Sequence, residues 1–200
     1  MMFVANAART LVLLLACAAL MPALTPFAKA AETADRNERE RNYFSDTVLL
    51  DQDGRQRRFF TDTLMGQTVL INFMFASCAG ACPIIVQRLI KAREILNGAG
   101  AGKIRFVSIT VDPGSDTPEE LRKYAAKFSI STENWTFLTG NPKAVNAVLQ
   151  KLGERAREPE AHTSILLAGN VSSRRWRKLR PDATPEAIAS VLREFSATSP

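Results

Sequence analysis

From residue 68 onward the sequence alternates between runs typical of buried strands and runs typical of amphipathic helices. Residues 68–75 and 104–111 have the length and apolar content of strands that are buried on both faces. Each is followed by a helical pattern, at residues 83–96 and from residue 118, in which apolar positions share one helical face. Strands that alternate with helices predict a mixed sheet flanked by helices, which is an α/β fold.

Hairpins are predicted at both ends of this alternation. The first covers residues 48–60, with its turn at Asp53-Gly54. The helix from residue 118 has a capping box formed by Thr117 and Glu120. The remaining predicted elements are a strand at 135–138, a helix from 141, a strand at 163–167, a hairpin return at 175–179 and a helix at 184–195.

The first 30 residues have the layout of a secretory signal peptide. Arg9 precedes an apolar stretch at residues 11–24, and the small-x-small triplet Ala28-Lys29-Ala30 follows it. The apolar run is too short for a spanning helix, which needs about 20 residues, so a retained anchor is the less favoured alternative. We therefore predict cleavage near Ala30, loss of Cys17, and export to the periplasm or the outer face of the cytoplasmic membrane.

The charged residues 31–42 are predicted to be a spacer, because they contain too little apolar surface to join a core. Residues 43–196 are predicted to form one domain. The formal net charge of the whole chain is +6, and acidic and basic residues are mixed along it. This balance gives no sign of nucleic-acid binding, and we expect a soluble domain that works close to a membrane.

Cys78 and Cys82 lie between the predicted strand 68–75 and the helix that follows it. Ligands usually bind at this end of the strands in an α/β sheet. Residues four apart on a helix have Cβ atoms about 5 to 6 Å apart, which suits a shared metal ion. A disulfide needs about 3.5 to 4.5 Å. The positive end of the helix is also expected to lower the pKa of both thiols.

Three interpretations of the pair remain open: a structural disulfide, a redox couple and a metal site. His162 is the single histidine of the chain, and it would be the third metal ligand if its strand runs antiparallel to residues 68–75. Two thiolates favour copper(I), imidazole also supports copper(II), and zinc is the rival ion.

Several motifs together resemble the SCO/SenC family of thioredoxin-like copper proteins. They are FMFASCAGACP, FVSITVDPGSDTPEELRKYA, WTFLTG and the lone His162 before a strand, and the resemblance covers residues 43–195. It implies a thioredoxin-like fold with an N-terminal hairpin added, and one copper ion, Cu(I) or Cu(II), held by Cys78, Cys82 and His162. The implied partner is the copper-receiving subunit of a terminal oxidase, cytochrome c oxidase in the family, or another copper protein.

Other residues near the motif are weighed less strongly. Asp112 ends a strand on the site's side and is a candidate to hydrogen-bond the histidine or a metal ligand. Asp116 is interpreted as an acidic residue suited to the start of a helix, and Met74 as a core residue.

An enzymatic alternative is a thiol-disulfide oxidoreductase that uses Cys78 and Cys82 to reduce partner cysteines. Thiol peroxidase activity is supported by the fold alone.

Overall fold

The computed structural model describes residues 25–97, 104–155 and 158–197. Most of the predicted signal peptide, including Cys17, lies outside these residues. The helices and strands are α2 Thr25–Phe44, β1 Val48–Asp51, β2 Gln56–Arg58, β3 Thr68–Met74, α3 Ala81–Asn97, β4 Ile104–Thr110, α4 Pro118–Lys127, β5 Trp135–Thr139, α5 Pro142–Lys151, β6 Leu166–Asn170, β7 Arg175–Leu179 and α6 Pro185–Ala197.

Within the described residues, the strands form one mixed sheet in the order β2-β1-β5-β4-β3-β6-β7. The central strands β3, β4 and β5 are parallel neighbours, whereas β6 pairs with β3 in the antiparallel sense. The hairpins β1-β2 and β6-β7 form the two edges. The predicted α/β fold with an N-terminal hairpin is therefore confirmed.

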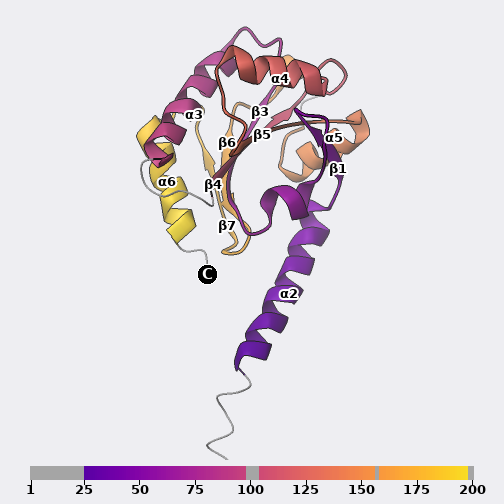
Figure 1. Cartoon of the computed structure of the whole chain (residues 1–200), viewed down its shortest axis with the longest axis vertical. Helices are drawn as coiled ribbons and strands as arrows, with labels where there is room; N and C mark the ends of the chain where they lie inside the picture. The colour runs from indigo at the N-terminus through magenta and orange to yellow at the C-terminus, as the bar shows by residue number, and fades with distance from the viewer. Residues whose placement is uncertain (1–24, 98–103, 156–157, 198–200) are drawn as a thin grey trace, which may run out of the picture. The chain divides into compact units, whose positions relative to one another are not determined.

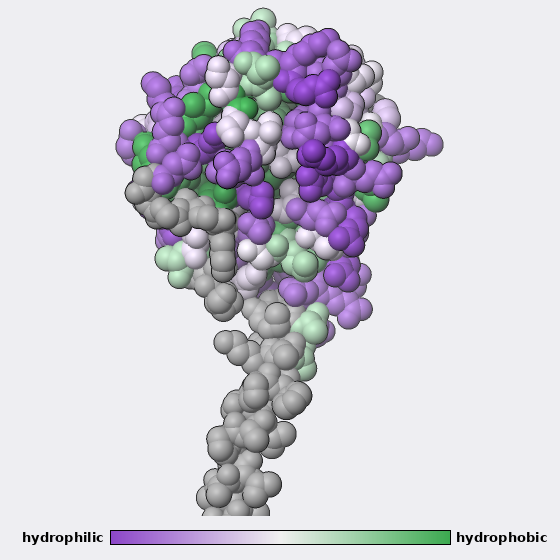
Figure 2. Space-filling view, in the orientation of Figure 1, coloured by the Kyte–Doolittle hydropathy of each residue, from purple (hydrophilic) through white to green (hydrophobic). Residues whose placement is uncertain are grey.

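Two hydrophobic cores lie on opposite faces of the sheet. Side chains alternate along β3, so Leu70 and Met74 face the core under α3, α4 and α6, while Ile71 and Phe73 face the core under α5. Figure 1 shows α3 and α6 side by side on one side of the sheet and α5 on the other. The face seen in Figure 2 is mostly hydrophilic, with hydrophobic residues in separate patches, as expected when the apolar side chains fill these cores.

The chain divides into two units, with the boundary between Arg39 and Glu40 inside α2. The predicted spacer, residues 31–42, is helical and lies within α2. Among the described residues, the helices are either too short or too polar to span a bilayer.

Two predicted strand boundaries are wrong. The strand placed at 163–167 is β6, which starts at Leu166, because Thr163 instead donates its backbone N–H to a side chain, that of Glu154. The first hairpin ends at Arg58, and the following residues 59–64 form a π-helix that buries two phenylalanines in the core. Side-chain packing, which local pattern does not report, decided both boundaries.

The packing of Trp176 explains why β6 has a glycine at position 169. Gly169 pairs with Trp176 on β7, and a Cβ atom at Gly169 would lie 2.1 Å from the indole ring. The ring therefore packs directly over the glycine backbone, and any side chain at this position would displace it.

Candidate metal centre

The two cysteines lie where the sequence places them, at the junction of β3 and α3, and both are free thiols. Cys82 is in the first turn of α3 and is only 4% exposed, whereas Cys78 lies in the preceding loop and is partly buried. The backbone N–H of Cys78 donates to the carbonyl oxygen of Phe75 at 3.1 Å. The loop thus continues directly from the end of β3, with the more accessible thiol first.

The electrostatic expectation for Cys82 is wrong in direction. Burial, followed by interaction with the neighbouring Cys78, raises the pKa of the Cys82 thiol to about 12. Hydrogen bonds with the backbone of Phe75, just after β3, and of Cys82 itself, at the start of the helix, lower this pKa, but their effect is smaller. Removing the thiol from water outweighs the helix terminus, so Cys82 keeps its proton at neutral pH, and a metal ion must displace it.

His162 follows a short 3₁₀ turn, Pro159–Ala161, and reaches the same end of the sheet. The antiparallel pairing of β6 with β3, on which this placement depended, is present. The imidazole packs edge-on against the ring of Phe75, with ring centroids 5.7 Å apart. The backbone of Phe75 also accepts the Cys78 hydrogen bond, so Phe75 contacts both the histidine and the loop that carries Cys78 (the thiol loop, residues 75–80).

The hydrogen bonding of His162 determines its tautomer. Its Nδ1 atom lies 2.5 Å from the carbonyl oxygen of Pro159. A carbonyl oxygen can only accept, so Nδ1 carries the proton and Nε2 of the neutral ring carries a lone pair. That Nε2 atom is buried and has no hydrogen-bond partner in the described part of the chain. Metal-binding histidines commonly have this arrangement, in which the other ring nitrogen donates to a carbonyl oxygen.

The structure does not assemble the three predicted ligands into one closed site. Across residues 25–97, 104–155 and 158–197, no three Cys, His, Asp or Glu side chains are placed so that they could hold a metal ion together. Cys78 and Cys82 neighbour each other, and His162 lies at the same edge with Phe75 beside it.

Asp116 has a role that its sequence position did not reveal. Its carboxylate accepts hydrogen bonds from the backbone N–H of Ala76, at 3.1 and 3.2 Å, and from the hydroxyl of Thr110. Burial raises the pKa of Asp116, and these hydrogen bonds oppose that shift. Asp116 therefore ties the start of α4 to the loop that carries Cys78.

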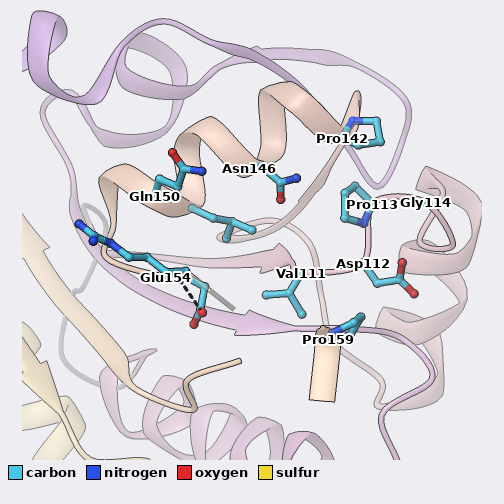
Figure 3. A pocket seen from close by; sticks show the side chains of 11 residues that line it. Val111, Asp112, Pro113, Gly114, Pro142, Asn146, Gln150, Glu154 and Pro159 are labelled. Carbon is cyan, nitrogen blue, oxygen red and sulfur yellow. Dashed lines mark hydrogen bonds between the residues drawn. The ribbon is translucent and has the colours of Figure 1, made fainter. Parts of the chain in front are cut away.

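Asp112, the residue favoured from the sequence, lies at a cavity beside the turn that precedes His162. It lines a cavity of 830 Å³ between the loop after β4 and helix α5. Figure 3 shows Asp112 near Pro159, with Asn146 and Gln150 along α5. Asp112 thus borders the histidine turn from the cavity side.

Glu154 anchors the histidine segment, which runs from Pro159 to Thr163. The sequence pattern did not predict this role. Glu154 is 2% exposed, and one carboxylate oxygen accepts both the backbone N–H and the hydroxyl of Thr163 at 2.7 Å. The other oxygen accepts the N–H of Arg155 at 2.8 Å, which is the dashed line in Figure 3. Because Thr163 follows His162 directly, Glu154 restrains the backbone beside the imidazole.

The comparison with known protein families agrees with these features. The SCO1/SenC family profile matches residues 33–197. This chain belongs to the SCO1/SenC family. The SCO1 protein homolog of Bacillus subtilis is 33% identical over 105 residues, covering 52% of this chain and 54% of that protein. The chain thus spans about half the length of the curated relatives it matches.

Solved structures show the same fold. BsSco, a member of the Sco family of cytochrome c oxidase assembly proteins in which a disulfide switch was identified, superposes with a TM-score of 0.65. It is 25% identical, and the match covers 76% of this chain and 91% of that one. Bradyrhizobium japonicum ScoI with copper bound superposes with a TM-score of 0.60 at 23% identity, covering 74% and 96%. The fold is that of the thioredoxin-like Sco proteins.

Proposed function

We propose that this protein carries one copper ion, bound by the sulfur atoms of Cys78 and Cys82 and by Nε2 of His162. The recipient is the copper-receiving subunit of a terminal oxidase, with cytochrome c oxidase as the first candidate. Family membership supports this role, as do the relatives described as cytochrome c oxidase assembly proteins and as copper-bound. The donor set also fits, because two thiolates and one imidazole suit copper(I) and can hold copper(II).

One observation carries the proposal: the free Nε2 lone pair of His162. A buried imidazole nitrogen without a partner is unfavourable in a finished structure. Here the nitrogen lies at the edge of the sheet where two free thiols also lie. Coordination of copper would give that nitrogen its partner, while the hydrogen bond from Nδ1 to Pro159 holds the required tautomer.

Copper loading requires the His162 ring and the thiol loop to approach each other. The histidine segment can shift without breaking strand pairing, because β6 begins only at Leu166. Local contacts restrain it, among them the hydrogen bonds to the carbonyl oxygen of Pro159 and to the carboxylate of Glu154, and the packing of the ring against Phe75. We propose that the segment rearranges within these local contacts when the ion binds, which brings Nε2 toward the sulfur atoms.

Each cysteine has a distinct task in this proposal. Cys82 is buried and protonated, so it releases its proton to solvent when the ion binds and then holds the ion away from water. Cys78 is partly exposed and is the sulfur that an incoming protein can approach. Transfer then proceeds by ligand exchange, in which a recipient ligand replaces Cys78 first.

The test is titration of the reduced protein with copper(I) against a competing chelator of known affinity. We expect one ion per chain, weaker binding for His162→Ala, and the largest loss for Cys82→Ser. Zinc added in competition should not displace the copper, because thiolates prefer the softer ion. Unchanged copper affinity in both variants would end the proposal.

A second function is favoured by the free, neighbouring thiols. As a thiol-disulfide oxidoreductase, Cys78 would attack a partner disulfide and Cys82 would resolve the mixed disulfide. Two electrons and two protons leave the pair, which becomes a disulfide, and the partner gains two thiols. His162→Ala should leave this activity intact but weaken copper binding, so one variant separates the two functions. Whether the protein acts as an enzyme depends on that result.

We also propose that the protein acts outside the cytoplasm, as the signal-like first 30 residues suggest. The mass of the protein recovered from cells would show whether the chain starts after Ala30. An unprocessed mass would instead support retention of the segment as an anchor.

A further inference from the structure

The hydroxyl of Tyr124 is a buried polar group that the proposed function leaves unexplained. Tyr124 lies on the buried face of α4 with Leu121 and Ala125, and it is 5% exposed. Its hydroxyl oxygen is buried and has no hydrogen-bond partner in the described part of the chain. Such a hydroxyl destabilises the fold relative to phenylalanine, unless it gains a partner in another state of the protein.

The hydroxyl is held in a fixed place relative to the thiol loop. The ring of Tyr124 packs against Phe128 and Phe137, with centroids 4.9 and 6.1 Å away. At the start of the same helix, Asp116 binds the backbone N–H of Ala76 in the thiol loop. Ring packing and this anchor hold the hydroxyl in place, but they give it no hydrogen-bond partner.

The groups that interact electrostatically with this hydroxyl are the two cysteines and Asp116. Burial is the largest cause of the raised pKa of Tyr124, and negative charge on Cys82, then Cys78, then Asp116 raises it further. Cys82 and Tyr124 also belong to the same buried cluster, against which Cys78 packs. The O–H group is therefore an unpaired hydrogen-bond donor in the buried cluster that contains Cys82.

A protonated thiol is a weak acceptor, whereas a sulfur atom that carries negative charge is a strong one. A cysteine coordinates copper through its thiolate, so the Cys82 sulfur would become a strong acceptor when copper is bound. We propose that Tyr124 is a positioning residue, whose O–H donates a hydrogen bond to the Cys82 sulfur in the copper-loaded state.

This inference rests on the proposed copper function and adds a residue to it. The unpaired hydroxyl weakens the copper-free state, and the hydrogen bond stabilises the loaded state. Both effects favour the binding of copper. Tyr124 thus contributes to copper affinity without contacting the ion.

The test compares Tyr124→Phe with Tyr43→Phe, each of which removes one hydroxyl. Tyr43 is 55% exposed and its hydroxyl donates to the carbonyl oxygen of Lys151, so it serves as the matched control. For Tyr124→Phe we expect one copper(I) ion per chain and about tenfold weaker binding, the loss of one hydrogen bond to a charged acceptor. The copper-free variant should be at least as thermally stable as the wild type.

A spectroscopic reading separates hydrogen bonding from packing. Loss of a hydrogen bond to a thiolate raises the energy of its lone pairs, so the sulfur-to-copper(II) absorption band should move to longer wavelength in Tyr124→Phe and stay in place in Tyr43→Phe. Unchanged copper affinity in Tyr124→Phe, or a copper-free variant that is markedly destabilised, overturns the inference. Failure of the wild type to bind copper overturns the proposed function as well, which distinguishes the two failures.

Discussion

Replacing Glu154 should release the histidine segment from the rest of the domain. Its carboxylate accepts hydrogen bonds from the N–H and the hydroxyl of Thr163 and from the N–H of Arg155. A hydrogen bond to a charged group contributes about 1.5 to 3 kcal/mol, but Thr163 and Arg155 are exposed, so water replaces part of the loss. We therefore expect Glu154→Ala to lower the free energy of unfolding by about 3 kcal/mol.

Glu154→Gln should have an intermediate effect. Its amide oxygen can still accept from Thr163, but its NH₂ group then faces the N–H of Arg155, so we expect a loss of about 1 to 2 kcal/mol. Urea unfolding of the copper-free protein measures the total effect. Hydrogen exchange at the Thr163 amide measures the local effect, because that N–H is bound to Glu154.

Copper binding should weaken together with this anchor, because a released histidine segment must be ordered again when the ion binds. A cost of about 1.4 kcal/mol corresponds to tenfold weaker binding. Glu160→Ala is the control, since Glu160 is an exposed carboxylate on the same segment. If the Thr163 amide exchanges at the wild-type rate in Glu154→Ala, the anchoring role is refuted.

Three further predictions concern the packing and the thiols. Asp116→Ala should free the N–H of Ala76 and make Cys82 easier to alkylate, and an unchanged alkylation rate would contradict the link between α4 and the thiol loop. Gly169→Ala should lower stability in urea unfolding by about 1 to 3 kcal/mol, because the new Cβ overlaps the Trp176 ring. Because Cys82 releases one proton when copper binds, copper affinity should rise about tenfold for each pH unit. Because the pKa of Cys82 is raised to about 12, this rise should continue above pH 9, where an ordinary thiol has already lost its proton.

The local sequence pattern was sufficient to predict those elements whose burial it encodes. The apolar runs of β3 and β4, the N-cap at Thr117 and the Asp53-Gly54 turn each depend on neighbours in the sequence, and the structure has all of them. Only half of the predicted capping box forms: Thr117 accepts the N–H of Glu120, but its own N–H donates to the carbonyl oxygen of Ser115, and the Glu120 carboxylate pairs with Lys123. The position of the two cysteines at the junction of β3 and α3 follows from the same local order. The start of β6 did not, because Thr163 is engaged by a distant carboxylate.

What the sequence by itself determined was the alternation of strands and helices, the thiol pair at the carboxyl end of a central strand, and the family motifs. Tertiary structure alone decided that Asp116 binds a loop 40 residues earlier, that Glu154 restrains the histidine segment, and that Tyr124 shares a buried cluster with Cys82. It also reversed the expected pKa shift of Cys82. The reason is physical: hydrogen-bond partners and desolvation depend on which surfaces meet in the folded chain, whereas helix and strand patterns depend on neighbours a few residues apart.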